Sequence, residues 1–323
     1  MKHINIKGYG KCLPDKVVSN DDLSQIVDTS DEWIVQRTGI HNRRISDVPT
    51  SKLAYQASLQ ALQDAGIEAN ELDAIVVATM TPDNITPSVA CLVQKDLNIL
   101  KDEFIAFDIN AACTGFIYAL QIAASLLHSG KHNILVIGAE TTSRIIDFQN
   151  RNTCVLFGDG AGAVVLSDDG NDEMFFYTNS IGNDEYLLSR SFDTNEHLLN
   201  HKMEASFLEM NGKEVFKFAI KANEDAIQEI LNQNHITIND IDLWIPHQAN
   251  IRILNMVSKR LGIDSSSMFI NLNQYGNTSA ASVGIALCEA HEQNRIQNCR
   301  NIVLTGFGAG LTYGAVLIRK EMK

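Results

Sequence analysis

Short continuous runs of Val, Ile and Leu recur along the chain and alternate with segments whose apolar residues return every three to four positions. Runs of the first kind are typical of strands buried on both faces, and the second pattern is typical of amphipathic helices. The predicted strands are Ala74–Ala78, Ile134–Gly138, Ala163–Leu166, Leu243–Ile245, Ile302–Thr305 and Ala315–Ile318. The predicted helices are Asp21–Val27, Lys52–Ala65, Cys113–Ser129, Phe216–Asn232, Ala249–Leu261 and Ala280–Gln293. This alternation predicts an α/β fold with largely parallel sheets. The helix Cys113–Ser129 is apolar nearly all round, so we expect it at the centre of the molecule.

The chain carries a faint internal repeat. Residues 57–78 and 226–246 share an amphipathic helix, a short turn and an apolar run, and His132–Gly138 resembles Arg300–Gly306. Both pairs are separated by about 170 positions, which indicates a duplication. We therefore predict two halves, residues 1–172 and 173–323. The polar stretch Asp184–Phe207 is predicted to be a surface excursion that could act as a lid.

Composition narrows the possible functions of the 323-residue chain. It carries 26 Lys and Arg against 39 Asp and Glu, a net charge of −13. An acidic surface repels phosphates, so nucleic acid is not an expected partner. No apolar stretch has the length of a signal peptide or a membrane span, so we expect a cytoplasmic protein without a membrane partner. The six cysteines form no C-x-x-C pair, so neither a metal site nor a disulfide framework is expected.

Cys113 is the first candidate for chemistry. It lies between the apolar run Phe104–Ile109 and the predicted central helix. A thiol at the start of a helix lies at the positive end of the helix dipole, which favours the nucleophilic thiolate. The alternative is a buried cysteine that serves only packing.

His247 and Asn277 are the second and third candidates. His247 directly follows the predicted strand Leu243–Ile245, and sites in α/β folds gather at the carboxyl ends of strands. Alone, it could equally be a structural histidine at a strand end, and Gly276-Asn277 could be a simple turn. However, residues 110–120 align with 277–287 across the repeat. The duplication would bring both segments to one centre and make a Cys–His–Asn constellation plausible.

Two glycine clusters have open interpretations. Gly158, Gly160 and Gly162 imitate a dinucleotide-binding fingerprint, but a strand rather than a helix is predicted to follow, which argues against such a site. The cluster Gly306–Gly310 lies between two predicted strands. It could supply backbone N–H groups to an oxyanion or form a tight hairpin.

Several motifs together carry a resemblance that runs almost end to end. They are Asp28–Ile40 (DTSDEWIVQRTGI), the Cys113 segment, Phe157–Ala163, Pro246–Ile253 (PHQANIRI), Tyr275–Ser282 (YGNTSAAS) and Gly306–Leu317. On these motifs the chain resembles the β-ketoacyl-[acyl-carrier-protein] synthase III family of condensing enzymes in the thiolase superfamily. The resemblance implies a thiolase fold, with duplicated halves in a five-layer αβαβα arrangement, and a homodimer. It also implies an acyltransferase that condenses an acyl-CoA, expected to be acetyl-CoA, with malonyl-[acyl-carrier-protein] at the start of fatty-acid biosynthesis.

The resemblance also assigns roles to residues. Cys113 would take up the acyl group, and His247 and Asn277 would donate hydrogen bonds to the malonyl thioester oxygen, so that no metal and no permanently bound cofactor is needed. The N–H groups of Cys113 and Ala309 would form the oxyanion hole, with Phe307 packed beside it. The other implied residues are Thr29, Trp33, Arg37, Arg151, Phe216 and Asn250 for coenzyme A, Thr86 as the gate of the acyl pocket, and Arg252, Lys259 and Arg260 for docking of the carrier protein.

Three positions depart from the family pattern: Ala309 replaces a glycine, Leu311 an aromatic residue and Thr86 a bulky Phe. The smaller Thr86 could admit longer or branched acyl donors, as in a starter-unit synthase of a polyketide pathway. A degradative thiolase is disfavoured because residues 306–314 contain no second cysteine. A papain-like hydrolase shares the order Cys, His, Asn but not its C-G-S-C-W motif. A binding protein with a dead site is disfavoured by the intact triad.

Overall fold

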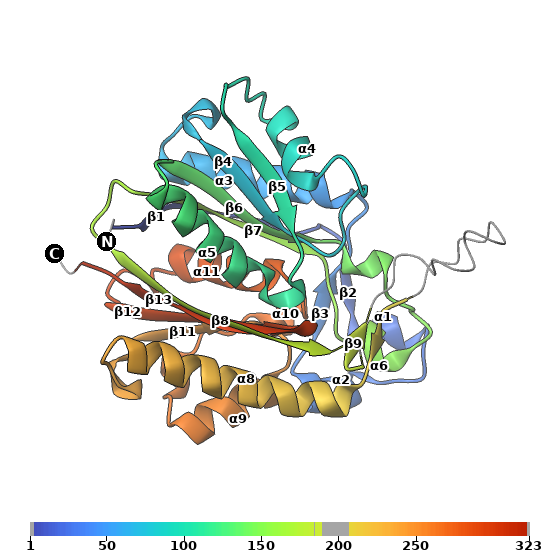
Figure 1. Cartoon of the computed structure of the whole chain (residues 1–323). Helices are drawn as coiled ribbons and strands as arrows, with labels where there is room; N and C mark the ends of the chain where they lie inside the picture. Colours follow the sequence, from blue (N-terminus) through green and yellow to red (C-terminus); the bar gives the residue numbers. More distant parts are fainter. Residues whose placement is uncertain (1–2, 184, 189–206, 322–323) are drawn as a thin grey trace.

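The computed structural model describes residues 3–183, 185–188 and 207–321. These residues form five layers, in the order helix, sheet, helix, sheet, helix (Figure 1). The predicted α/β class and its five-layer arrangement are confirmed. Most of the stretch predicted as a lid lies outside the described residues. Its described flank forms a small ladder, β9 (Leu187–Leu188) with β10 (Glu209–Met210).

Each half of the chain contributes one sheet. The first sheet has the order β1 (Asn5–Cys12), β7 (Gly160–Ser167), β6 (Asn133–Glu140), β4 (Ala74–Ala78), β5 (Ile105–Ile109). The second has the order β8 (Glu173–Asn183), β13 (Gly310–Arg319), β12 (Asn301–Gly308), β11 (Leu243–Pro246). The two sheets share one strand order. The first four strands of the first sheet (β1, β7, β6, β4) correspond in turn to the strands of the second (β8, β13, β12, β11). This common order is the arrangement that a duplicated chain would produce.

Both sheets are mixed, so the prediction of largely parallel sheets is wrong. Among the strands that the structure describes in these two sheets, only the pairs β4–β5, β4–β6 and β11–β12 are parallel. A single residue, Ala309, joins β12 to β13, and so short a connection forces an antiparallel pair. Strands β1 and β8 were not predicted. In β1, polar residues and glycines interrupt the apolar positions, so no apolar run marks the strand. In β8, the apolar run Met174–Tyr177 is present but was overlooked.

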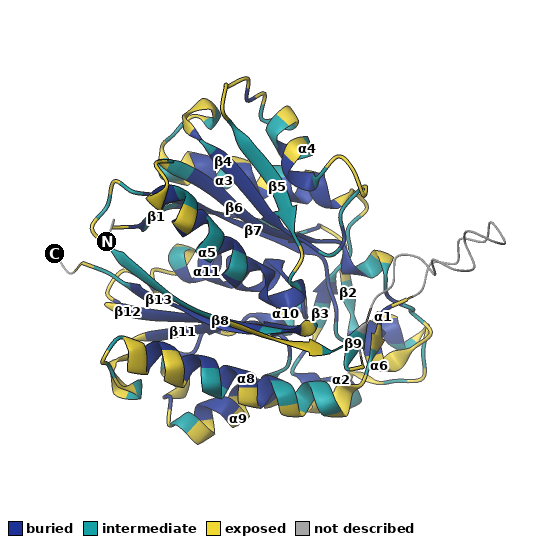
Figure 2. Ribbon diagram, viewed as in Figure 1, coloured by how far each residue is buried: buried dark blue, intermediate teal, exposed yellow. Residues whose placement is uncertain are grey.

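Helices cover both sheets on both faces. α3 (Thr50–Ala65) packs on the outer face of the first sheet together with α4 (Val89–Asp96), and α8 (Gly212–Gln233) and α9 (Ile251–Leu261) cover the second. The central layer consists of α5 (Gly115–His128) and α11 (Ala281–Glu292), and Figure 2 shows both as largely buried. The central position predicted for the apolar helix is therefore confirmed.

The glycines of Phe157–Ala163 serve close packing at this layer. A Cβ added to Gly162 would lie 2.3 Å from the backbone of Gly284 in α11, so only glycine fits. A strand follows this cluster, as predicted, because β7 begins at Gly160. Gly162 thus lets α11 approach the first sheet, whereas a Cβ on Gly158 would meet the backbone of Tyr275 at the end of α10 (Leu272–Tyr275).

Short elements complete one end of the molecule. They are β2 (Val17–Ser19), α1 (Asn20–Ser24), α2 (Asp31–Thr38), β3 (Asn42–Arg44), α6 (Arg151–Cys154) and α10 (Leu272–Tyr275). Helix α1 is shorter than predicted, and α2 was not predicted. Among the described residues, no helix combines the length and apolar character needed to cross a bilayer.

Candidate active site

Cys113, His247 and Asn277 line one cavity of about 670 Å³. Two of them come from the second half of the chain and one from the first. Phe307, Ala309 and Leu311, from the turn between β12 and β13, line the same cavity. The structure therefore brings the predicted triad together with the predicted oxyanion loop, although 134 to 164 positions separate Cys113 from its partners.

Cys113 lies in a tight turn between β5 and α5. The turn is a 3₁₀ segment, Ala112–Thr114, and α5 starts at Gly115, two residues later than predicted. Ala112 adopts a left-handed conformation with φ +46°. The Asn110 side-chain oxygen accepts a hydrogen bond from the N–H of Ala112 at 3.1 Å. This turn holds the thiol, only 4% exposed, at the wall of the cavity.

Asn277 lies in an equivalent turn before α11. Ser279 has φ +49°, and its N–H donates to the Asn277 side-chain oxygen at 2.8 Å. Because that oxygen is already engaged, the amide NH₂ is the group left to meet a ligand. The backbone of Asn277 also bonds to the first half, with its N–H donating to Leu156 O at 2.8 Å. Leu156, which lies just before β7 in the first half of the chain, thus helps to fix Asn277 of the second half.

His247 follows the last residue of β11. Its N–H donates to Thr305 O of β12 at 2.7 Å, and its ring meets Phe307 edge to face with centroids 5.2 Å apart. The neighbouring Gln248 is buried and binds backbone groups of Phe269 and Asn271, which holds the turn in place. His247 Nδ1 is buried and has no hydrogen-bond partner within the described part of the chain.

Burial leaves the side chains of Cys113 and His247 uncharged. It raises the pKa of the Cys113 thiol to about 12 and lowers the pKa of His247 to about 3, because each charged form would lose its hydration. The expectation that the helix start favours a thiolate is thus opposed by desolvation. The start of α5 can still stabilise negative charge on sulfur as it develops during attack.

The pKa of His247 leads to a prediction about stability. Below about pH 6.5 an unfolded chain protonates this histidine, whereas the folded chain does so only near pH 3. The free energy of unfolding of the parent protein should therefore fall relative to His247→Gln as pH drops from about 7 to about 4, by up to roughly 1.4 kcal/mol per pH unit. Denaturant titrations across this range measure it, and parallel curves for the two proteins would contradict a neutral His247.

The turn after β12 packs directly against the cysteine. A Cβ added to Gly308 would lie 2.8 Å from Cys113 N, so glycine is required for this approach. The Thr312 hydroxyl lies 3.1 Å from Ala111 O and 3.0 Å from Ala309 O. One side chain thus ties the turn before Cys113 to the turn that carries Ala309.

A second cavity, of about 920 Å³, adjoins the first and shares Leu156, Gly212, Phe216 and Asn250 with it. Its other lining residues include Trp33 and five cationic side chains, which are Arg37, Arg151, Lys213, Lys217 and Arg252. Five of the six residues expected to contact coenzyme A therefore line this outer cavity, and Thr29 does not. Lys213 and Lys217 were not predicted, because isolated lysines on a helix resemble any solvated surface.

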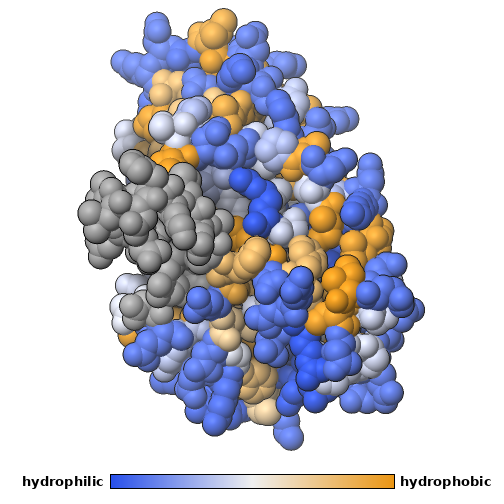
Figure 3. Space-filling view, turned by 90° about the vertical axis from the view of Figure 1, so that its right-hand side faces the viewer, coloured by the Kyte–Doolittle hydropathy of each residue, from blue (hydrophilic) through white to orange (hydrophobic). Residues whose placement is uncertain are grey.

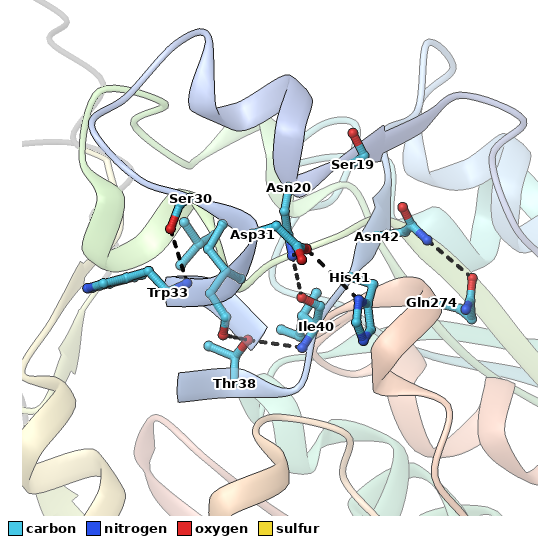
Figure 4. Close-up of polar contacts among 12 residues, drawn as sticks. Ser19, Asn20, Ser30, Asp31, Trp33, Thr38, Ile40, His41, Asn42 and Gln274 are labelled. Atoms are coloured by element: carbon cyan, nitrogen blue, oxygen red, sulfur yellow. Dashed lines mark hydrogen bonds and ion pairs between the residues drawn. The ribbon is translucent and has the colours of Figure 1, made fainter. Parts of the chain in front are cut away.

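Trp33 is presented by α2, whose first turn is held by a cap. The Trp33 N–H donates to Ser30 Oγ at 3.2 Å, and the ring points away from the polar cluster of Asn20 and Asp31 (Figure 4). The guanidinium carbons of Arg37 and Arg151 lie 4.3 and 5.0 Å from the ring centroid. An aromatic face flanked by two guanidinium groups suits a flat base next to phosphates. Figure 3 shows the side of the molecule with α1, α2 and α6 as mostly hydrophilic, with smaller hydrophobic patches.

The remaining predicted residues lie outside the inner cavity. Thr86 is exposed and does not line the cavity of its own chain. Arg252, Lys259 and Arg260 are exposed on α9, where Arg260 pairs with Glu224 of α8 at 3.2 Å. Among the described residues, no three His, Cys, Asp or Glu side chains converge as metal ligands.

Comparison with known proteins identifies the family. A model of "3-Oxoacyl-[acyl-carrier-protein (ACP)] synthase III" matches residues 107–184, and the model of its C-terminal part matches residues 231–320. The chain is 47% identical to the beta-ketoacyl-[acyl-carrier-protein] synthase III of Clostridium tetani, over 98% of both chains.

Solved structures agree with this assignment. The synthase III of Aquifex aeolicus superposes with a TM-score of 0.90 at 44% identity, covering 98% of this chain and all of the other. The priming β-ketosynthase of the R1128 polyketide pathway has a TM-score of 0.88 at 33% identity, covering 98% of this chain and 96% of the other. With nearly half of its residues identical to a full-length relative, the chain belongs to the 3-oxoacyl-[acyl-carrier-protein] synthase III family.

Proposed function

We propose that this protein is an acyltransferase that condenses an acyl-CoA, with acetyl-CoA as the expected donor, and malonyl-[acyl-carrier-protein]. The products are a 3-oxoacyl-[acyl-carrier-protein], coenzyme A and carbon dioxide, and the reaction initiates fatty-acid biosynthesis in the cytoplasm. The observation that carries this proposal is the cavity shared by Cys113, His247 and Asn277, joined to an outer cavity rich in cationic side chains.

The first half-reaction transfers the acyl group to Cys113. The sulfur attacks the thioester carbonyl, the bond from the acyl carbon to the sulfur of coenzyme A breaks, and the thiol proton leaves with coenzyme A. The N–H groups of Cys113 and Ala309 are the proposed donors to the oxyanion. The tight contact between Gly308 and the cysteine turn supports this role, because it holds the two backbone segments together.

The second half-reaction begins with the loss of carbon dioxide from the malonyl group. The electrons of the broken C–C bond form an enolate, whose oxygen accepts hydrogen bonds from His247 and the Asn277 NH₂. A neutral imidazole suits this role, because it donates one hydrogen bond without carrying a charge into a buried site. The enolate carbon then attacks the carbonyl carbon of the acyl-cysteine, the bond from that carbon to the sulfur of Cys113 breaks, and the released thiolate takes up a proton from water. These two donors do the work that a Lewis acid would do, so the reaction as written requires neither metal nor bound cofactor.

Coenzyme A is proposed to occupy the outer cavity, with its thioester reaching through the shared residues. Trp33, Arg37 and Arg151 would hold the adenine, and Phe216 and Asn250 would flank the passage. Asn250 donates to Arg37 O at 3.0 Å, which links the passage to α2. Thr29, which lies outside the lining, would contact the nucleotide only at its edge.

The carrier protein is proposed to dock on α9. Arg252, Lys259 and Arg260 are exposed there on a protein of net charge −13, so they form a local cationic surface for an acidic partner. Reversing the charge of Arg252 and Lys259 together is expected to raise the KM for malonyl-carrier protein about tenfold or more. Steady-state kinetics with each substrate varied in turn measure this.

Because Arg252 also lines the outer cavity, the control is Lys259→Glu alone, which leaves that cavity intact. Its KM for acyl-CoA should stay unchanged while its KM for the carrier protein rises. Equal shifts of the two KM values would refute the docking surface.

A homodimer is proposed because β5 forms the open edge of the first sheet. Unpaired edges of this kind are usually covered. The neighbouring Ile85 is 81% exposed, and a cavity of about 780 Å³ is lined by Ile85, Phe107 and Asp108. Pairing of β5 with a second copy would cover these residues. It would also bring Thr86 to the partner, where it could act as the gate to the acyl pocket.

Priming of a polyketide pathway is the second candidate, supported by the likeness to the R1128 ketosynthase. The identity of 47% to the beta-ketoacyl-[acyl-carrier-protein] synthase III of Clostridium tetani, against 33% to the polyketide enzyme, supports the first candidate. A panel of acyl-CoA donors with malonyl-carrier protein, read by mass spectrometry, tests the proposal. Condensation with acetyl-CoA is expected to be fastest. No condensed product from any donor would refute the function, and a preference for long donors would favour the second candidate.

A further inference from the structure

Glu140 is a carboxyl group within the protein for which the mechanism above has no use. It is the last residue of β6 and is 0% exposed. Its oxygens accept hydrogen bonds from Thr79 Oγ1 at 3.2 Å, Thr81 Oγ1 at 2.5 Å, Met80 N at 3.2 Å and Ser279 Oγ at 3.1 Å. Burying a carboxyl group is costly unless such partners compensate for lost water. The first three partners belong to the same half of the chain as Glu140, and only Ser279 comes from the other half.

Ser279 links this carboxylate to the asparagine of the triad. Its hydroxyl donates to Glu140 Oε1, and its backbone N–H donates to Asn277 Oδ1 at 2.8 Å. The second bond decides which end of the Asn277 amide faces the cavity, because an engaged oxygen leaves the NH₂ for the ligand. The position of Ser279 therefore controls the position of a proposed enolate donor.

The duplicated turn shows that alanine can adopt this backbone conformation, so the Ser279 hydroxyl serves to fix the turn against Glu140 of β6 and not to form it. Ala112 occupies the position equivalent to Ser279, with φ +46° against +49°, and its N–H makes the same bond to Asn110 Oδ1. When β6 is aligned with its counterpart β12 in the other half, the residue equivalent to Glu140 is Gly308. Only the turn that carries Asn277 thus has both a hydroxyl and a carboxylate behind it.

The same pair also lies close to Cys113. The charge of Glu140 raises the pKa of the thiol, while the Ser279 hydroxyl lowers it. Burial also raises the pKa of Glu140 itself, to about 7. Glu140 itself does not line the cavity, so its hydrogen-bonded link to the triad runs through Ser279.

We propose that Glu140 is a positioning residue which, through Ser279, holds the Asn277 amide in the orientation required for decarboxylation of the malonyl group. The inference rests on the proposed function, since it assigns a second residue pair to the half-reaction in which Asn277 acts. The two turns that line the cavity then have different roles. The turn before α5 serves acylation, and the turn before α11, held by Glu140, serves decarboxylation.

The test compares Ser279→Ala and Glu140→Gln with the parent enzyme. Ala112 shows that alanine adopts the required backbone conformation, so Ser279→Ala should fold normally. Release of labelled carbon dioxide from malonyl-carrier protein measures decarboxylation, and transfer of label from acetyl-CoA in a single turnover measures acylation. Both variants should lose decarboxylation by about tenfold or more, with acylation changed by less than about threefold.

Double variants separate positioning from general destabilisation. Ser279→Ala should add little to Glu140→Gln and nothing to Asn277→Ala, because all three act through one chain of contacts. The matched control is Ser58→Ala, which removes another fully buried hydroxyl, bonded to Ala54 O in α3. It should change neither half-reaction. Thermal unfolding of every variant shows whether it is folded.

The outcomes also separate this inference from the proposed function. Unchanged decarboxylation in folded Ser279→Ala and Glu140→Gln would overturn the inference, as would equal loss of both half-reactions. If Asn277→Ala itself decarboxylates normally, the proposed role of Asn277 fails, and the inference fails with it. If Asn277→Ala is impaired and the other two are not, only the inference fails.

Discussion

Cys113→Ser is expected to abolish formation of the acyl-enzyme and to reduce condensation by roughly four orders of magnitude or more. A serine hydroxyl in the same buried turn is a far weaker nucleophile than sulfur, and the cavity holds no second thiol among its lining residues. Incubation with radiolabelled acetyl-CoA, followed by denaturation and counting of protein-bound label, measures the first step. Mass spectrometry of the intact chain counts the acyl groups.

The chain offers a matched control for this variant. Cys288 in α11 is also buried, and burial raises the pKa of its thiol to about 12 as well. It does not line the inner cavity. Cys288→Ala should therefore become acylated at the parent rate, since placement in the cavity, and not thiol acidity alone, distinguishes the two cysteines. Unchanged labelling of Cys113→Ser would remove Cys113 as the nucleophile.

His247→Ala and Asn277→Ala are expected to show the opposite pattern. Each should still accept the acyl group, while release of carbon dioxide from malonyl-carrier protein falls by about 10²- to 10³-fold, the usual cost of removing one donor to an oxyanion. The reason is that the two side chains are proposed to stabilise charge only after the carboxylate leaves. Measuring each half-reaction separately distinguishes this pattern from a general loss of activity.

Two further results bear on this split of roles. His291→Ala is a suitable control, because that ring stacks on Tyr9 outside the inner cavity and should affect neither step. If His247→Ala loses acylation as strongly as decarboxylation, then the imidazole takes part in activating Cys113, and the role proposed here is wrong.

Many of the predicted elements were correct because their patterns are local. The buried strand β4 and the central helix α5 are nearly uniformly apolar, and few other environments accommodate such segments. Strand β1 and helix α2 were missed because few of their residues are apolar and buried. The apolar run Met174–Tyr177 of β8 would have supported a strand and was overlooked. The mixed sheets were also missed, because the direction of a strand depends on the length of its connection to its neighbour, and apolar runs do not reveal that length.

The residues of the candidate site also differ in whether the sequence could identify them. Cys113, His247 and Asn277 could be named from their motifs and from the alignment of residues 110–120 with 277–287. Glu140 was overlooked, although it lies at the carboxyl end of a strand, as His247 does, and the same argument would have marked it. The lysines of the outer cavity had no local signature at all.

From the order of amino acids alone, the apolar central helix and the candidate side chains Cys113, His247 and Asn277 could be inferred, because their patterns lie within short segments. The duplication could be inferred because such segments recur along the chain. Folding decided the rest. The contact of Ser279 with Glu140 joins residues 139 positions apart. The ionisation of Cys113 and His247 follows from desolvation by the packed layers around them, and desolvation exists only once distant segments have closed over a side chain.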